Sequence, residues 1–89
     1  MLTSSHSVMT EQVTATDVRF ADNLLYISLN DGREVSLPLE RIRWLAWLLK
    51  ATAEQRANWV IEPGGYAIYW EELDDGIEIS HILGMEPLV

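Results

Sequence analysis

Residues 24–38 read LLYISLNDGREVSLP, and this stretch determines the architecture of the chain. Apolar and polar side chains alternate on both sides of its centre, which is typical of strands with one buried face. The central Asp31-Gly32 supplies residues that tolerate a positive φ, as a tight turn between antiparallel strands requires. Pro38 has no N–H to donate to a neighbouring strand, so it ends the second strand. The stretch therefore predicts an antiparallel β-hairpin.

A third strand is predicted immediately upstream of this hairpin. Residues 13–20 are rich in β-branched side chains, and a turn at Asp22-Asn23 leads into the hairpin. Together the three strands form an antiparallel β-meander. Residues 1–11 are mostly small and polar, so we expect a disordered N-terminal tail, in which Met9 offers an alternative start.

A central helix is predicted over residues 38–50. Its apolar side chains fall into two stripes at helical spacing, which is more than contact with one sheet requires. After it, Thr52 and Gln55 have the spacing of a capping box and start a short second helix that ends near residue 58. The first stripe consists of Ile42, Leu45, Ala46 and Leu49, and the second of Trp44, Trp47, Leu48 and Ala51.

The last third of the chain is predicted to return to strands. Residues 59–62 and 66–70 form two of them, and residues 77–79 form a shorter extended piece. Ser80 then caps a final helical turn, which Gly84 ends. Strands followed by helices and again by strands are typical of the α+β class.

Length and composition limit the class of protein. Eighty-nine residues with 48% apolar side chains make one domain, expected over residues 12–85, with a C-terminal tail over residues 86–89. The lack of Cys excludes disulfides and thiolate metal sites. A net charge of −8 repels phosphate backbones, so we expect no direct contact with nucleic acid. The apolar runs are too short to span a bilayer, and we expect a cytoplasmic protein that does not bind membranes.

An ordered string of residues in the second half resembles the bacterial family known as domain of unknown function 2442. The resemblance implies an α+β domain over about residues 13–84 and a family without an established activity. Some longer relatives continue into a helix-turn-helix, which we do not expect here. This sequence departs from the family pattern at Tyr69, Glu71 and Gly76. The matching residues are Ala51-Thr52, Glu54-Gln55-Arg56, Trp59, Gly65, Ile68-Tyr69-Trp70, Leu73-Asp74, Ile77 and Ile82-Leu83.

Candidate catalytic and metal-binding groups are few. Carboxylates cluster in one turn, where solvation keeps them ionised and their spacing is not that of an EF-hand loop. His6 and His81 are the only histidines, and without Cys they supply too few of the three or four converging ligands that zinc requires. We therefore predict a protein that is not an enzyme and has no metal or cofactor, with an enzyme that uses Asp74, Asp75 and Glu71 as the unfavoured alternative. The turn contains Glu71, Glu72, Asp74 and Asp75.

Two surfaces are candidates for partner binding. Residues 59–89 contain seven acidic side chains and no Lys or Arg, so they form either a solvated sheet face or a surface that attracts a basic protein. The second helical stripe is either buried within the domain or in contact with another chain, a copy or a different protein. Arg41, Arg43, Lys50 and Arg56 could face the acidic region, within one chain or between copies.

The sequence thus predicts a small protein-interaction or regulatory module, an adaptor or accessory subunit, which binds a protein partner or forms a homo-oligomer. The alternative is a DNA-associated transcriptional regulator or antitoxin-like protein that acts through another protein. The candidate partner-binding residues are Trp44, Trp47, Leu48, Tyr66, Tyr69, Trp70, Glu71, Asp74 and Asp75.

Overall fold

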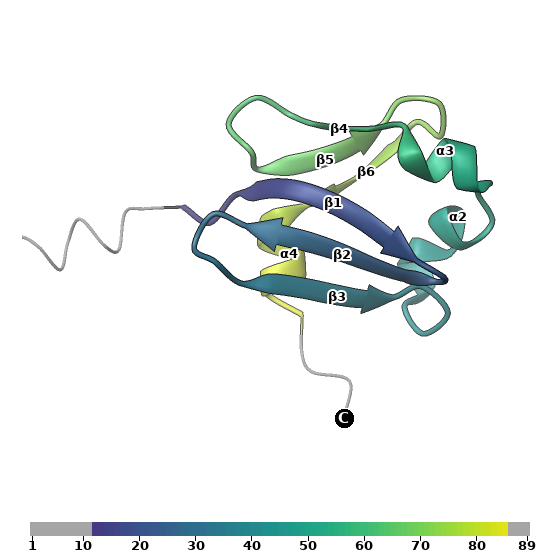
Figure 1. Ribbon diagram of the computed structural model, residues 1–89, viewed down its shortest axis with the longest axis horizontal. Coiled ribbons are helices and arrows are strands. Elements are labelled where there is room, and N and C mark those ends of the chain that lie inside the picture. Colours follow the sequence, from purple (N-terminus) through teal and green to yellow (C-terminus); the bar gives the residue numbers. More distant parts are fainter. Residues whose placement is uncertain (1–11, 86–89) are drawn as a thin grey trace, which may run out of the picture.

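The computed structural model describes residues 12–85. This part of the chain forms two three-stranded antiparallel sheets and several short helical segments (Figure 1), so the α+β class is confirmed. The two predicted tails, residues 1–11 with His6 and Met9 and residues 86–89, lie outside the described residues.

The first sheet is the predicted β-meander. It consists of β1 (Ala15–Ala21), β2 (Leu24–Leu29) and β3 (Glu34–Pro38), in that spatial order. Asp22 adopts a φ of 54° in the turn between β1 and β2, a conformation that Asp and Asn tolerate better than most residues. Gly32, with a φ of 94°, serves the same purpose between β2 and β3. The sheet buries one face, because the burial pattern alternates along β2.

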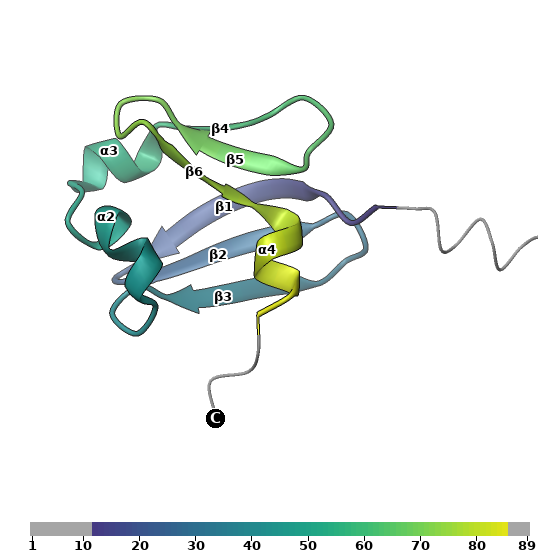
Figure 2. The same ribbon diagram turned by 180° about the vertical axis from the view of Figure 1, so that it is seen from behind.

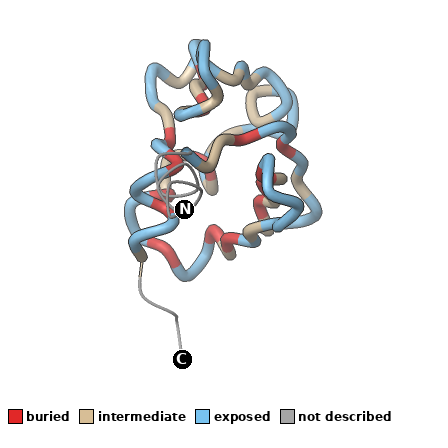
Figure 3. The backbone as a smooth tube through the Cα atoms, turned by 90° about the vertical axis from the view of Figure 1, so that its left-hand side faces the viewer, coloured by how far each residue is buried: buried red, intermediate tan, exposed pale blue. Residues whose placement is uncertain are grey.

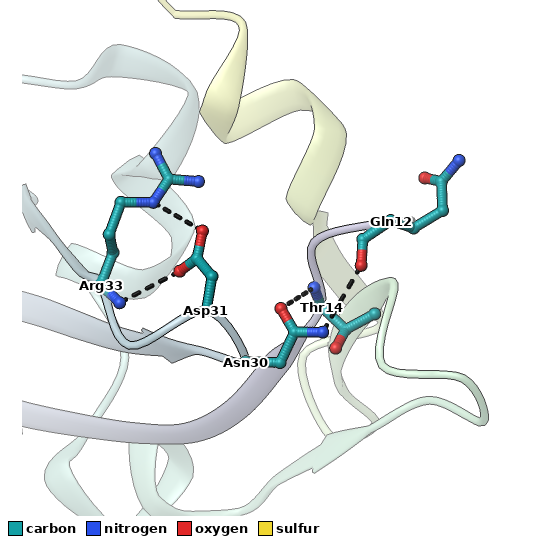
Figure 4. A network of polar contacts seen from close by, with 5 residues as sticks. All are labelled: Gln12, Thr14, Asn30, Asp31 and Arg33. Atoms are coloured by element: carbon teal, nitrogen blue, oxygen red, sulfur yellow. Dashed lines mark hydrogen bonds and ion pairs between the residues drawn. The ribbon is translucent and has the colours of Figure 1, made fainter. Parts of the chain in front are cut away.

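Polar side chains at the tip of the second hairpin hold it to the start of β1 (Figure 4). The Asn30 side-chain oxygen accepts a hydrogen bond from the Thr14 N–H at 3.1 Å. Asp31 accepts two hydrogen bonds from Arg33, at 3.0 Å from the backbone N–H and at 2.8 Å from Nε. These bonds lower the pKa of the Asp31 carboxyl below its ordinary value, the backbone hydrogen bond being the largest cause.

The helix predicted over residues 38–50 is confirmed only over residues 43–49, and it is not one continuous α-helix. The segment contains a turn, the 3₁₀-helix η1 (Arg43–Leu45) and the short helix α2 (Ala46–Leu49). The first residues of this segment belong to the first sheet, because Pro38 pairs with Leu24 and the Leu39 N–H donates a hydrogen bond to the Asn23 carbonyl. Side chains are buried at every third position, a spacing tighter than the 3.6 residues of an α-helical turn. The buried residues are Leu39, Ile42, Leu45 and Leu48.

The rest of the chain builds the second sheet. Helix α3 (Ala53–Ala57) precedes β4 (Trp59–Ile61), β5 (Ala67–Trp70) and β6 (Asp75–Glu78), and α4 (Ile79–Leu83) follows. The three strands lie side by side in chain order.

The two predicted helix starts have different outcomes. The capping box at α3 is confirmed: the Thr52 side chain accepts from the Gln55 N–H at 3.1 Å, and the Gln55 side chain accepts from the Thr52 N–H at 3.0 Å. Ser80 does not cap α4, because the helix already begins at Ile79, whose side chain is buried. Gly84 follows the last residue of α4, as predicted.

The buried residues form one core cluster, to which both sheets and the helical segments contribute. Helix α4 crosses one face of the first sheet (Figure 2), and buried positions recur on both sheets and on the helical segments (Figure 3). Trp70 is wholly buried, with its ring centroid 5.5 Å from that of Trp47 and 6.4 Å from that of Phe20 in edge-on packing. Its indole N–H donates a hydrogen bond of 3.0 Å to the Arg56 carbonyl.

The Arg56 side chain connects the helical segment to the first sheet. Its Nε donates to the Leu48 carbonyl at 2.9 Å, and its Nη2 donates to the Leu49 carbonyl at 3.1 Å. The same guanidinium reaches the β1–β2 turn, where Nη1 donates to the Asp22 carbonyl at 3.1 Å and Nη2 to the Asn23 side-chain oxygen at 3.2 Å. One half-buried cation therefore satisfies carbonyls that end α2 and a turn more than thirty residues earlier.

Candidate protein-interaction surface

The outer face of the β4–β6 sheet is the candidate surface. The strand register places Val60 opposite Tyr69, and Tyr69 opposite Gly76, so these three residues cross the face in one row. Ile68 and Trp70 alternate with them and point into the core. Val60 is 55% exposed, although it lies within a strand.

Exposed carboxylates surround this row. Asp74 lies closest, since its Oδ1 accepts a hydrogen bond from the Tyr69 hydroxyl at 2.6 Å. This bond is the main reason why the pKa of the Tyr69 phenol is raised above its ordinary value, and the nearby charges of Glu71 and Glu62 add to the shift. The ring therefore lies in a strongly negative environment, and Asp74 holds its orientation.

The acidic turn is more ordered locally than its composition suggests. Asp75 accepts a hydrogen bond from the Gly76 N–H at 2.8 Å. Asp74 takes the left-handed conformation, with a φ of 53°. Glu72 accepts a hydrogen bond of 3.1 Å from the Gln55 side chain, which links the turn to α3.

The carboxylates of the second sheet have no basic partner among residues 12–85. The ion pairs in this part of the chain join Arg19 to Glu34 and Arg33 to Asp31, all in the first sheet and its hairpin. Arg56 does not face the acidic region, because its guanidinium is held by backbone carbonyls and Asn23. Unpaired charges of one sign on one face attract oppositely charged partners over about a Debye length.

The structure disperses the predicted aromatic stripe. Leu48 is wholly buried, and Trp47 is half-buried against the Trp70 ring, so Leu48 and Trp70 belong to the core and cannot touch a partner of the folded domain. Trp44 is 37% exposed, and its ring contacts His81 edge-on with centroids 4.7 Å apart.

The remaining predicted residues lie at the second sheet. Tyr66 is 51% exposed and immediately precedes β5, where the alternation of the strand places it on the side of Ile68 and not on that of Tyr69. Tyr69, Glu71 and Asp74 come together on the outer face, and Asp75 begins β6 beside them. Glu62 and Glu78, which the sequence prediction did not single out, flank Ala67: the Glu62 N–H donates to the Ala67 carbonyl, and Ala67 pairs with Glu78.

Two hollows in the described part of the surface are large enough to receive a side chain or a small ligand. One of about 310 Å³ lies on the outer face of the second sheet, beside Tyr69. Another of about 550 Å³ lies between β1, α3 and β4, where Phe20, Arg56 and Trp59 contribute to its walls. In the described residues, no three His, Asp or Glu side chains are close enough to share a metal ion. Residues 12–85 also contain no helix that is long and apolar enough to cross a membrane.

The raised pKa of Tyr69 has a measurable consequence. Folding favours the protonated phenol, so this contribution to stability is present below the unfolded pKa of about 10 and is lost as the pH rises through the raised value. In a spectrophotometric titration at alkaline pH, we expect Asp74→Asn to lower the pH at which Tyr69 ionises, because a neutral amide replaces the anionic acceptor. The Tyr69→Phe variant identifies which phenolate signal belongs to this residue. Equal midpoints in the wild type and Asp74→Asn would contradict the prediction.

Comparison with known proteins supports the fold and the family. A search of curated proteins finds no match. A crystal structure of a protein of unknown function from Rhodospirillum rubrum superimposes with a TM-score of 0.68 over 82% of this chain and 87% of that one, at 20% sequence identity. The model of the family described as "Protein of unknown function (DUF2442)" matches residues 15–86. Because that match covers most of the chain, the protein belongs to the DUF2442 family, as its sequence pattern predicted.

Proposed function

We propose that this domain is a small, non-catalytic protein-interaction module, an adaptor or accessory subunit, which binds a basic partner protein through the outer face of the β4–β6 sheet. The observation that carries the proposal is the composition of that face. Exposed carboxylates surround Val60 and Tyr69, and none of them pairs with a base in the described part of the chain.

Electrostatics and burial favour a protein as the partner. Charges of one sign on an exposed face speed the encounter with an oppositely charged partner and suppress encounters with acidic ones. The exposed side chain of Val60 and the neighbouring ring of Tyr69 add apolar and aromatic area that a partner can cover. The same charges repel nucleic-acid phosphates, which argues against a nucleic acid as the partner.

The local contacts of the acidic turn support a non-catalytic role. Asp74 is engaged with the Tyr69 hydroxyl and Asp75 with a backbone N–H. Both side chains are exposed to solvent and are not enclosed in a cleft that would hold a substrate against them.

Co-purification from the host at native abundance tests the proposal. We expect the wild-type chain to retain one stoichiometric partner and to release it as the ionic strength rises. Combined replacement of Glu62, Glu71 and Glu78 by Gln should abolish retention. Asp17→Asn, Glu40→Gln and Glu54→Gln, combined in one matched control, remove the same charge elsewhere and should leave retention intact.

Two results would refute this function. If the variant with the altered face still retained the partner, the interface would have to lie on another face of the protein. Recovery of the chain alone, or only with copies of itself, would show that no other protein is the partner.

A further inference from the structure

We propose that the hollow beside Tyr69 receives a single arginine side chain of the partner, with its guanidinium against the Tyr69 ring and between the carboxylates of Glu62 and Glu78. This inference rests on the proposed function and specifies its central contact. The hollow measures about 310 Å³. Its lining consists of Glu62, Ala67, Ile68, Tyr69, Gly76, Ile77 and Glu78.

The strand register explains why a hollow forms at this place. Glu62, Ala67 and Glu78 occupy one row across the three strands, with the small Ala67 between the two carboxylates. In the next row Gly76 lies opposite Tyr69 and contributes no side chain. The two small residues thus leave a depression that an aromatic ring and two carboxylates border.

The Tyr69 ring is held in place beside this depression. A Cβ added to Gly76 would lie only 3.2 Å from Tyr69 Cδ1 and 2.7 Å from the Ile68 carbonyl oxygen, so the glycine allows the ring to approach β6. The hydroxyl is fixed at its other end by Asp74, at 2.6 Å. A ring that is already oriented loses little entropy when a ligand packs on it.

The outer face of the first sheet contains an arginine packed on a tyrosine beside a carboxylate. The Arg19 guanidinium carbon lies 4.0 Å from the centroid of the Tyr26 ring. The same guanidinium pairs with Glu34 at 3.5 Å. Tyr26 lies on the middle strand, with Arg19 directly opposite it on β1 and Glu34 one row away on β3. In the second sheet Tyr69 also lies on the middle strand, and Glu62 and Glu78 lie one row away on the two neighbouring strands, but the residue opposite Tyr69 on β4 is Val60. In the second sheet the carboxylates and the tyrosine are present, but no arginine accompanies them in the described residues.

The chemistry of the site favours arginine over other cations. A planar guanidinium can stack on an aromatic ring and donate hydrogen bonds to carboxylates on both sides, whereas an ammonium is a compact, strongly hydrated charge. Arg41 and Arg43 are exposed, so a second copy could also supply the side chain. The net charge of −8 opposes self-association, and we therefore assign the arginine to a basic partner.

Binding of N-acetyl-L-arginine methylamide, followed by NMR on the ¹⁵N-labelled chain, tests the assignment. We expect saturable shifts at the amides of Ala67, Tyr69 and Gly76, with a Kd of about 1–10 mM. N-acetyl-L-citrulline methylamide has nearly the same shape without the charge and should bind about tenfold more weakly. The combined Glu62→Gln and Glu78→Gln variant should weaken arginine binding by a similar factor, whereas Glu40→Gln with Glu54→Gln should not.

Several outcomes would overturn the inference. Equal binding of the citrulline compound, or arginine binding that the Glu62→Gln and Glu78→Gln changes leave intact, would refute the paired-carboxylate site. Shifts that grow with protein concentration alone and include Arg41 or Arg43 would identify a second copy as the source. If the arginine compound fails to bind while the outer face still retains a partner in co-purification, this inference falls and the proposed function stands.

Discussion

Replacement of Arg56 by methionine is expected to lower the free energy of unfolding by about 2–4 kcal/mol, which urea denaturation monitored by tryptophan fluorescence will measure. Methionine keeps much of the apolar stem, but it removes all the guanidinium donors and the contact of the guanidinium carbon with the Phe20 ring, 5.6 Å from the ring centroid. The carbonyls of Leu48 and Leu49, at the end of α2, then lose a charged donor, as does the Asp22 carbonyl in the β1–β2 turn. Hydrogen bonds from a charged donor contribute more than neutral ones.

Arg41→Met provides the matched control for this prediction. The Arg41 side chain is exposed and makes no hydrogen bond with the described residues, so its replacement should change the free energy of unfolding by less than about 0.5 kcal/mol. Similar losses in the two variants would mean that the Arg56 contacts add no stability beyond the loss of one positive charge from an acidic protein.

Truncation of Trp70 to alanine is expected to cost about 3–5 kcal/mol of unfolding free energy. The side chain is wholly buried between Trp47 and Phe20, and its loss leaves a cavity at the centre of the core. A chain of this length has a total stability of about 4–13 kcal/mol, so the variant will be close to its unfolding midpoint or beyond it. Differential scanning calorimetry together with circular dichroism will show the reduced melting temperature.

Two further variants separate the contributions of this residue. Trp70→Phe keeps an aromatic ring but loses the donor to the Arg56 carbonyl, and we expect a loss of about 1–2 kcal/mol. Trp44→Ala removes a ring that is 37% exposed, and its cost should stay near 1 kcal/mol. A larger loss for Trp44→Ala than for Trp70→Ala would place the centre of the core elsewhere.

Local signals in the sequence predicted the local parts of the fold. Asp31-Gly32 located the second hairpin, and Thr52 with Gln55 located the start of α3. Each of these features depends on residues a few positions apart. The length and regularity of the central helix were mispredicted, because apolar side chains at residues 42–49 fit a 3.6-residue period and also fit the three-residue period that the structure uses.

Long-range contacts explain what the sequence could not predict about the site. The sequence left open that Arg56 faces the carboxylates, but its partners are mainly backbone carbonyls, which no residue pattern reveals. Composition correctly placed a concentration of acid in the second sheet, yet the role of Glu62 and Glu78 depends on the register that brings them to either side of Ala67. The contact between Tyr69 and Asp74 likewise requires the turn to reverse the chain.

The division into two meanders has a consequence for how the chain folds. Each sheet connects neighbouring strands through short turns, so each can form on the timescale of hairpins, about 1–10 μs. Other contacts join the two halves of the chain. They include the hydrogen bond from the Ala15 N–H to the Gly65 carbonyl and the contacts of Arg56 and Trp70 with the first sheet. Because these contacts link segments that are distant in the sequence, forming them costs more loop-closure entropy. We therefore expect docking of two preformed sheets to be the late step. Substitutions of Arg56 and Trp70 should therefore raise the unfolding rate constant more than they lower the folding rate constant.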